Sequence, residues 1–446
     1  MSAYNNSKPG AVIVVGGGLA GLAAATYLAR AGWTTTLYEK AHTTGGRALT
    51  NVIGDFRFNM GPHALYCSGP AEQILRELGV SYSGKKPKIK AEVFYQGEVY
   101  TPQGGFTPLF NPRWLGLRDF PGLIKFLARL FTVNPAKLAH LSVEEWLNQT
   151  KLSEAARQTL YALDRVATYT NAPELQSADT FVIQLKHVLK TGVRYLDGGW
   201  QTLVNNLRQA ALDAGVKIVA GKRVAEVVGD GRVEGVRLVS GEFIPAVAVV
   251  LAAEPQEAAQ LVDNTALKTW AKAVQPARAA CLDIALKELP YPDRTFVPGI
   301  DVPLYYSVHS AYAKLGPAGT TVLHVAKYLR PDETTVAKDD ERELEAFMDK
   351  VQPGWRDEVL EKRFLPHMTV INAFPRADQG GLAGRFGPTV PGFANLYLAG
   401  DWVGPEGLLL DSVLSSARRA ARLINDPATQ PQEIEVQRGK QPVGSL

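Results

Sequence analysis

Residues 11–40 read AVIVVGGGLAGLAAATYLARAGWTTTLYEK, and this stretch decides the fold. An apolar run enters three glycines, a segment of small residues follows, and a second strand-like run ends in an acid. The order predicts a strand over residues 11–15, a helix over 19–31 and a strand over 34–38. Such a βαβ opening is typical of an α/β fold with a parallel sheet.

The turn between the first strand and the helix carries the pattern GxGxxG. In this pattern Gly16 permits the tight turn, Gly18 lets the backbone approach a pyrophosphate, and Gly21 lets the helix pack closely on the strand. The helix begins at Leu19 and Ala20, and its free amides would face the phosphates. We therefore expect a dinucleotide site here, against the alternative of a merely structural glycine turn.

An acid closes the second strand, 18 positions after Gly21. The carboxylate of Glu39 can accept hydrogen bonds from two ribose hydroxyls, and it would repel the 2′-phosphate of NADP. Lys40, its neighbour, is included in the predicted cofactor site.

A second glycine pair, Gly45 and Gly46, then brings the backbone close to the cofactor, and Arg47 supplies a forked guanidinium that suits a pyrophosphate oxygen. The alternative is a Gly-Gly turn with a solvated arginine.

Composition restricts the class of protein. The chain has 446 residues, 46% of them hydrophobic, and its 48 basic and 44 acidic residues leave a net charge of +4, too dilute to indicate a nucleic-acid partner. Two distant cysteines, Cys67 and Cys281, predict neither a disulfide framework nor a CxxC motif, and the seven histidines show no metal-ligand spacing. With no signal-like or membrane-spanning run, we expect a cytoplasmic protein without a metal site, and contact with a membrane surface stays open.

Further elements are expected along the chain. Residues 107–190 read as helical, with a capping box at Ser142 and Glu145. Residues near 201–214, 339–351 and 411–424 read as helices. Strands are expected at residues 216–220, 224–228, 233–239, 246–252, 281–286, 304–308, 321–326, 368–372 and 395–399.

Together with the Gly400-Asp401 pair near the end of the chain, these motifs resemble the FAD-dependent superfamily of flavin amine oxidases, protoporphyrinogen oxidases and phytoene desaturases. The resemblance implies that Val224 contacts the adenine of FAD. It also implies that Asp401 binds the ribityl or pyrophosphate part, and that a helix beginning near Leu409 directs its amides at the flavin. The alternative for Gly400-Asp401 is a turn that closes an α/β sheet.

Departures from the amine oxidase pattern point to one branch. Residues 407–411 read GLLLD where many amine oxidases have a tyrosine, and residues 253–257 lack the lysine that many of them carry. No cysteine follows Cys281, so the resemblance implies noncovalent FAD. These features favour the phytoene-desaturase-like branch, whose substrates are long, apolar polyenes and related lipids.

The resemblance also places a loop containing Gly61 and Pro62 along the flavin ring. His63 in this loop is then the candidate catalytic residue, as an acid, a base or a hydrogen-bond donor to the flavin. The alternative is that His63 satisfies a buried backbone carbonyl.

Residues 113–131, RWLGLRDFPGLIKFLARLF, are unusually apolar. They are too short to span a bilayer. Three interpretations stay open: a helix that roofs the substrate cavity or core, an interfacial helix that docks on a membrane, and a surface for a partner. Charged residues at Phe126 and Leu127 would test docking.

The predicted architecture is a discontinuous Rossmann-type FAD-binding domain with an inserted α+β substrate domain. The first would comprise residues 1–78, 192–278 and 366–426, and the second residues 79–191 and 279–365, with a flexible tail at 427–446. The resemblance implies an FAD-dependent oxidoreductase that transfers hydride between flavin N5 and a polyene, isoprenoid or lipid-like substrate, with oxygen, a quinone or another electron acceptor. Alternatives are a flavin-dependent amine or amino-acid oxidase, and a lipid carrier without activity.

Overall fold

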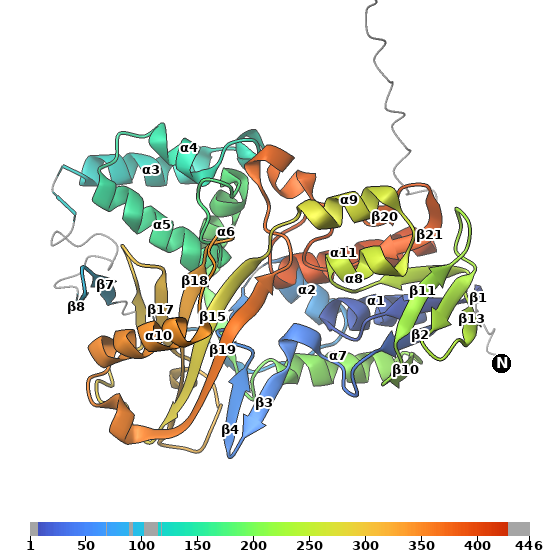
Figure 1. Cartoon of the computed structure of the whole chain (residues 1–446), viewed down its shortest axis with the longest axis horizontal. Coiled ribbons are helices and arrows are strands. Elements are labelled where there is room, and N and C mark those ends of the chain that lie inside the picture. The colour runs from blue at the N-terminus through green and yellow to red at the C-terminus, as the bar shows by residue number, and fades with distance from the viewer. Residues whose placement is uncertain (1–7, 68, 89–91, 102–114, 117, 427–446) are drawn as a thin grey trace, which may run out of the picture.

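The structure, a computed structural model, describes residues 8–67, 69–88, 92–101, 115–116 and 118–426. Within them the chain forms two lobes that meet near the middle of the molecule (Figure 1). The predicted tail, most of the predicted lead-in at residues 1–9, and Arg113, Trp114 and Leu117 lie outside the described residues.

One lobe is built on a six-stranded sheet of order β10-β2-β1-β14-β21-β20, in which every neighbouring pair but the last is parallel. Alternate residues of its first strand enter two different cores: Val12 and Val14 pack on one face, Ile13 and Val15 on the other. A continuous apolar run is expected when both faces of a parallel sheet are buried. The strands are β1 (Lys8–Val15), β2 (Trp33–Glu39), β10 (Lys217–Ala220), β14 (Ala248–Leu251), β20 (Thr389–Val390) and β21 (Phe393–Leu398).

Helices cover both faces of this sheet. Helices α1, α2, α7 and α11 pack on one face, and α8, α9 and the small antiparallel sheet β11-β12-β13 pack on the other. These elements are α1 (Leu19–Arg30), α2 (Pro70–Glu77), α7 (Gln201–Asp213), α8 (Pro255–Leu261), α9 (Thr265–Ala273), α11 (Leu410–Asn425), β11 (Val224–Val228), β12 (Gly235–Leu238) and β13 (Phe243–Pro245).

The second lobe contains a five-stranded antiparallel sheet of order β16-β17-β18-β15-β19. Helix α10 packs on one face, where Leu282 and Ile284 meet Leu344 and Phe347. The opposite face turns toward the first lobe. The elements are β15 (Ala277–Leu286), β16 (Phe296–Pro298), β17 (Leu304–Val308), β18 (Thr321–Leu329), β19 (Val359–Ile371) and α10 (Ala337–Val351).

A helical layer completes this lobe, with a core of its own. The capping box is confirmed, because the Ser142 hydroxyl accepts from the Glu145 amide and the Glu145 carboxylate accepts from the Ser142 amide. Among the described residues we find no helix long and apolar enough to cross a bilayer. The helices are α3 (Phe120–Thr132), α4 (Val143–Asn148), α5 (Glu154–Thr168) and α6 (Ala178–Thr191).

The remaining short strands form three small sheets. They pair as β3-β4, β5-β9-β6 and β7-β8. Their bounds are β3 (Thr50–Ile53), β4 (Phe56–Asn59), β5 (Leu65–Tyr66), β6 (Gly84–Lys85), β7 (Val93–Tyr95), β8 (Glu98–Tyr100) and β9 (Val193–Leu196).

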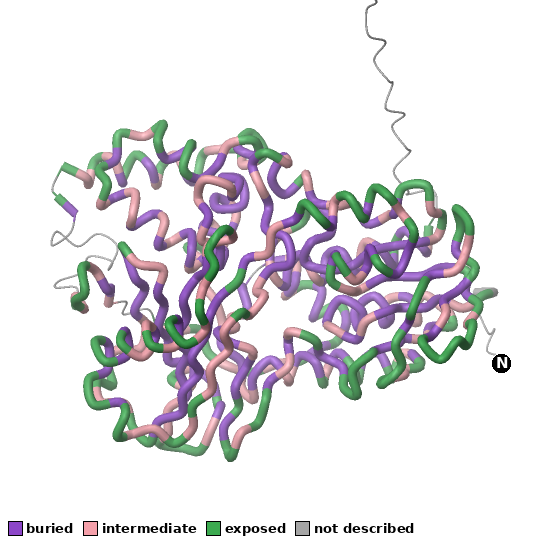
Figure 2. The backbone as a smooth tube through the Cα atoms, in the orientation of Figure 1, coloured by how far each residue is buried: buried purple, intermediate pink, exposed green. Residues whose placement is uncertain are grey.

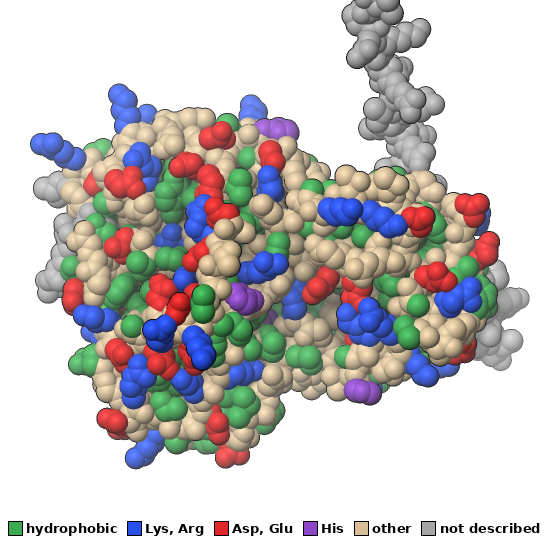
Figure 3. All heavy atoms as spheres, in the orientation of Figure 1, with side chains coloured by type: hydrophobic (Ala, Val, Ile, Leu, Met, Phe, Trp, Pro, Cys, Tyr) green, Lys and Arg blue, Asp and Glu red, His purple; other side chains and the backbone are tan. Residues whose placement is uncertain are grey.

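The predicted α/β class is confirmed, with buried chain in the interior of both lobes (Figure 2). The expected strand at 368–372 was too short: β19 has 13 residues, and most of its first half is partly exposed, so it lacks the apolar signature of a buried strand. The three-residue β13 was missed because its residues are not buried. Acidic and basic side chains are intermixed over the face shown in Figure 3.

Candidate cofactor and active site

The glycines of the first turn have three different surroundings. A side chain on Gly16, whose φ is +109°, would overlap the Ala252 carbonyl, and one on Gly21 would overlap the Gly16 carbonyl. Gly18 differs, because no heavy atom lies within 4 Å of the place where its Cβ would be. Two of the glycines therefore serve the packing of the turn, and Gly18 leaves open space.

The carboxylate of Glu39 is fixed above this turn. One oxygen accepts from the Gly17 amide at 2.6 Å and the other from the Ala41 amide at 2.7 Å. Each oxygen keeps a lone pair, so the pair of ribose hydroxyls expected from the sequence could still be bound.

The second glycine loop packs against the first. The Gly45 amide donates to the Gly17 carbonyl at 2.8 Å. A Cβ added to Gly46 would lie 3.6 Å from the Gly18 α-carbon. Both residues have positive φ, +137° and +55°, which glycine adopts most easily. The two loops thus form one backbone-lined edge of the site.

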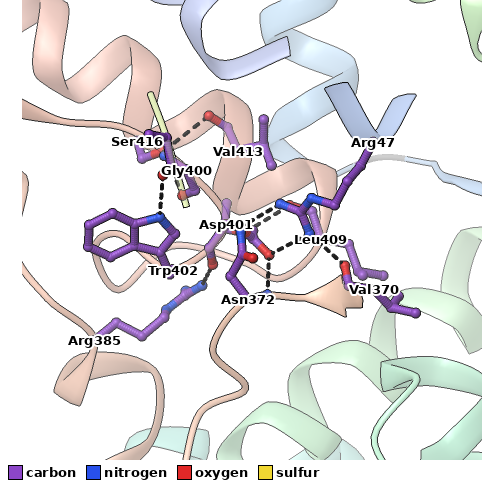
Figure 4. Close-up of polar contacts among 12 residues, drawn as sticks. Arg47, Val370, Asn372, Arg385, Gly400, Asp401, Trp402, Leu409, Val413 and Ser416 are labelled. Atoms are coloured by element: carbon purple, nitrogen blue, oxygen red, sulfur yellow. Dashed lines mark hydrogen bonds and ion pairs between the residues drawn. The ribbon is translucent and has the colours of Figure 1, made fainter. Parts of the chain in front are cut away.

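Arg47 and Asp401 form an ion pair across the site (Figure 4). The guanidinium donates to both carboxylate oxygens, at 2.8 and 3.1 Å, and to the Val370 carbonyl at 2.9 Å. Asn372 donates to the same carboxylate through its backbone and side-chain amides, both at 2.8 Å. Burial would raise the pKa of Asp401, but Arg47 and Asn372 hold it below its ordinary value. The carboxylate is therefore ionised and oriented.

The start of α11 is tied to the same strand end. The Gly400 amide donates to the Ser416 hydroxyl, which donates to the Gly400 carbonyl (Figure 4). Leu409 precedes the helix at φ +54° and ψ −128°, a conformation that a leucine adopts only under strain. Backbone strain of this kind at the N-terminus of a helix is characteristic of ligand sites.

A cavity of about 630 Å³ runs between these elements. Of the predicted cofactor residues, Gly21 and Gly61 do not line it: Gly21 packs against Gly16, and Gly61 packs against Met368. Lys40 lines the cavity, but its ammonium is bound to Glu257 at 2.8 Å. The predicted residues that line it are Gly16, Gly18, Leu19, Ala20, Glu39, Lys40, Gly45, Gly46, Arg47, Pro62, His63, Val224, Gly400, Asp401 and Leu409.

His63 lies on the cavity wall, on the loop after β4. Its Nδ1 donates to the Gly61 carbonyl at 3.1 Å, and its ring meets Trp200 edge-on at 4.9 Å. Burial lowers the pKa of His63 to about 4, so the imidazole is neutral near pH 7. The structure thus contains the carbonyl contact of the alternative interpretation and keeps the ring at the cavity.

Several lining residues were missed from the sequence. Tyr169, Met368 and Val370 come from the second lobe, and only the fold brings them to the glycine loops. Trp200 follows a glycine pair at 198–199, which is a usable signal. Tyr169 has a positive φ of +60° at the end of α5, which the sequence does not announce.

One cluster has the side chains of a metal site. Ligand atoms of Cys281, Asp283 and His324 lie within 4.8 Å of one another, although the sequence showed no metal-ligand spacing. Both oxygens of Asp283 already accept hydrogen bonds from protein donors, including the guanidinium of Arg363. A cation there would face that guanidinium, so we assign no metal.

A known family and several known proteins are similar to this chain. A family model described as flavin containing amine oxidoreductase matches residues 19–425. The chain is 26% identical over 291 residues to a 4,4'-diapolycopen-4-al dehydrogenase of Metabacillus indicus, across 57% of this chain and 58% of that protein. It is 28% identical over 341 residues to an all-trans-zeta-carotene desaturase of Myxococcus xanthus, across 68% and 61%. Both matches span less than two thirds of the relative's length.

Solved structures show the same fold. An oxidoreductase from Methanosarcina mazei aligns with a TM-score of 0.74 at 18% identity, over 92% of this chain and all of that one. Cyclohexylamine oxidase from Brevibacterium oxydans IH-35A aligns with a TM-score of 0.71 at 16% identity, over 94% of this chain and all of that one.

Proposed function

Because the chain belongs to the flavin-containing amine oxidoreductase family, we propose that it binds FAD noncovalently and transfers hydride to or from a hydrophobic substrate. Its relatives are named for carotenoid dehydrogenation and desaturation, which supports a polyene, isoprenoid or related lipid as the substrate class. The proposal includes desaturation, saturation and isomerisation of such a substrate.

The residues fit FAD. Open space beside Gly18 suits a pyrophosphate, and the amides that begin α1 point to the same place. Glu39 would hold the adenosine ribose, Val224 the adenine, and Asp401 with the start of α11 the ribityl and ring portions. Both cysteines are buried and neither lines the cavity, which supports noncovalent binding.

One observation carries the choice of an apolar substrate. The described carboxylates that line the cavity are Glu39, Glu254, Glu257 and Asp401. Glu39 ends β2, Glu254 precedes α8 and Glu257 lies in the first turn of α8, all beside the glycine-rich turn, and Asp401 is paired with Arg47. Away from that turn, the described wall holds Met60, Tyr169, Met368, Val370 and Leu409, together with the polar residues His63, His367, Thr369 and Asn372. Apart from Asp401, which is paired with Arg47, this part of the described wall holds no carboxylate that could bind a cationic amine.

The chain's own groups then have defined tasks. Bound flavin supplies the hydride acceptor or donor. Tyr169, Met368 and Leu409 exclude water from the reacting atoms, and the neutral His63 is the proposed acid–base group. Oxygen, a quinone or another acceptor would reoxidise the flavin.

An amine or amino-acid oxidase is the second candidate. Tyr169, Tyr328 and Tyr305 form a chain of rings with centroids 6.1 and 6.2 Å apart next to the cavity. Aromatic faces attract cations, and the fold matches that of an amine oxidase.

An anaerobic screen separates the two candidates. The purified flavoprotein is mixed without oxygen with polyenes, sterols and amines, and the flavin absorbance is followed. We expect bleaching by an apolar compound. Bleaching by amines alone would replace the first proposal with the second. If the protein purifies without flavin and does not bind flavin that is added afterwards, both candidates are contradicted. That result would favour a lipid carrier.

We also propose that α3 touches a membrane surface. Its inner face is core, with Leu123, Phe126 and Leu130 buried, whereas Ile124 and Phe131 are 65% and 58% exposed. Phe126, named from the sequence as a test position, is therefore unsuitable, because a charge there would disrupt packing with Trp146.

The docking test uses the exposed pair. Ile124→Glu with Phe131→Glu should reduce recovery with anionic liposomes in flotation roughly tenfold. Val239→Glu, at a site 66% exposed on the other lobe, is the matched control. Equal flotation of both variants and the unmodified protein would exclude docking through α3.

The division of the chain into two discontinuous domains, with its boundary at 366 inside β19, also remains a proposal.

A further inference from the structure

A row of polar side chains crosses the second sheet on the face turned toward the first lobe. Arg363 on β19 lies opposite Asp283 on β15, which lies opposite His324 on β18, which lies opposite Ser307 on β17. Asp283, His324 and Ser307 are at most 1% exposed. The next row along, Cys281, Ala326 and Tyr305, belongs to an apolar cluster. Four polar residues in register across a buried sheet face call for an explanation.

Asp283 is the centre of this row. It accepts from His324 Nδ1 at 2.6 Å, from the Cys281 thiol at 3.1 Å and from the guanidinium of Arg363. Burial would raise the pKa of Asp283, but His324 and Arg363 hold it below its ordinary value. The carboxylate is thus an ionised anchor for Arg363.

Arg363 reaches from this anchor into the first lobe. Its Nη2 donates to the Asn59 carbonyl at 2.5 Å, and its guanidinium lies over the Phe58 ring at 5.4 Å. The Asn59 side chain in turn accepts from the Thr50 hydroxyl at 2.8 Å and from the Trp200 amide at 2.9 Å. Asn59 is therefore held at its backbone by the second sheet and at its side chain by the first lobe.

The loop that leaves Asn59 ends at the cavity. Gly61 has φ +77°, and a Cβ there would collide with Met368 and lie 3.5 Å from Cys281. Its carbonyl accepts from His63, whose ring lines the cavity. A continuous set of contacts thus connects Asp283, Arg363 and Asn59 to the imidazole of His63.

Stability alone is a weak reason for such a row. Buried ion pairs are often replaceable by apolar residues without loss of stability, because desolvation offsets their attraction. A planar guanidinium, by contrast, bridges two acceptors in a fixed geometry. Here those acceptors are a carboxylate of one lobe and the carbonyl that begins a cavity loop of the other.

We propose that Arg363, anchored by Asp283, is a positioning residue that fixes loop 59–63 and thereby sets His63 against the bound flavin. The inference rests on the proposed flavin site and on no particular substrate.

The test uses Asp283→Asn with Arg363→Gln, which removes both charges together and so leaves no unpaired buried ion. Lys362→Gln is the control, because Lys362 is the next residue on β19 and is bound to Glu345 at 2.5 Å, on the α10 side. In flavin-free protein, amide hydrogen exchange of residues 59–63 should rise roughly tenfold in the double variant and stay unchanged in the control.

In the flavin-loaded protein, the double variant should shift the visible absorption bands and weaken FAD binding roughly tenfold. In a His63→Gln background the same pair of changes should no longer shift the bands, because the effect passes through that ring. A purely structural row would lower the melting temperature and leave the spectrum as it was.

Unchanged exchange of the loop, or an unchanged spectrum with bound FAD, would overturn the proposal. Failure of the unmodified protein to bind FAD would instead overturn the proposed function, and the exchange measurement would still decide the role of Arg363. If the double variant does not fold, Arg363→Lys serves: it keeps the charge, cannot bridge both acceptors, and should still raise the exchange.

Discussion

The two walls of the cavity are built in opposite ways. The wall near the six-stranded sheet takes its glycine-rich surface from one part of the sequence, in which residues 15–20, 38–40 and 45–49 supply backbone amides, glycines and the acid Glu39. Residues 222–224, 252–254 and 399–401 complete this wall. The wall near the antiparallel sheet comes from Tyr169, Met368 and Val370, which approach only because the strands and α5 fold together. Backbone chemistry in consecutive residues leaves a motif in the sequence, whereas side chains assembled across a sheet leave none.

The largest effects should separate two glycines of the first wall. Gly21→Ala places a methyl on the Gly16 carbonyl, so the unfolding free energy should fall by roughly 3 kcal/mol or more. Gly18→Ala places a methyl in open space at a backbone φ of −73°, so the protein should stay folded and lose FAD affinity roughly a hundredfold. Calorimetry and flavin titration distinguish the two.

The comparison would fail if both variants lost stability equally, because Gly18 would then be structural too. It would also fail if Gly18→Ala bound FAD as tightly as the unmodified protein, since the space beside Gly18 would then not be where the cofactor lies.

The same contrast explains how much could be predicted. The βαβ opening, the glycine turn and Glu39 follow from local patterns, whereas the Gly400-Asp401 pair was assigned through the family resemblance, and the structure brings all of them to one cavity. The pairing of Arg47 with Asp401 could not be foreseen, because it joins residues 354 positions apart. The Arg363–Asp283–His324–Ser307 row depends on strand register, and its members lie on four strands whose order in the sheet differs from their order in the chain. Register across long connections is decided by packing, which one sequence does not display.

The second wall should respond to pH. Asp164 on α5 is buried beside the residues that lead into Tyr169, and burial raises its pKa to about 7 although Gln176 and Thr168 donate to it. An acid with a raised pKa in the folded state contributes stability that is full below about pH 4 and is lost as pH rises through 7. Asp164→Asn removes this titration and keeps the acceptor oxygen.

The variant should therefore match the unmodified protein near pH 4 and exceed its unfolding free energy by about 4 kcal/mol at pH 8. Denaturant unfolding at both pH values measures the difference. A constant difference between pH 4 and pH 8 would show that Asp164 does not titrate in that range.

The smallest effect concerns the acid of the first wall, and it tests the division between the walls directly. Glu39 offers two acceptor oxygens to the Gly17 and Ala41 amides, whereas a glutamine at this position would turn an amide donor toward one of them. We expect Glu39→Gln to weaken FAD binding roughly tenfold. FMN lacks the adenosine that Glu39 is proposed to hold, so its binding should not change. The Asp283→Asn, Arg363→Gln pair acts at the other wall, where both flavins place the same ring, and should weaken FMN and FAD alike. If Glu39→Gln lowered the affinities for FMN and FAD equally, Glu39 would affect the shape of the whole cavity. The two walls would then not act independently in flavin binding.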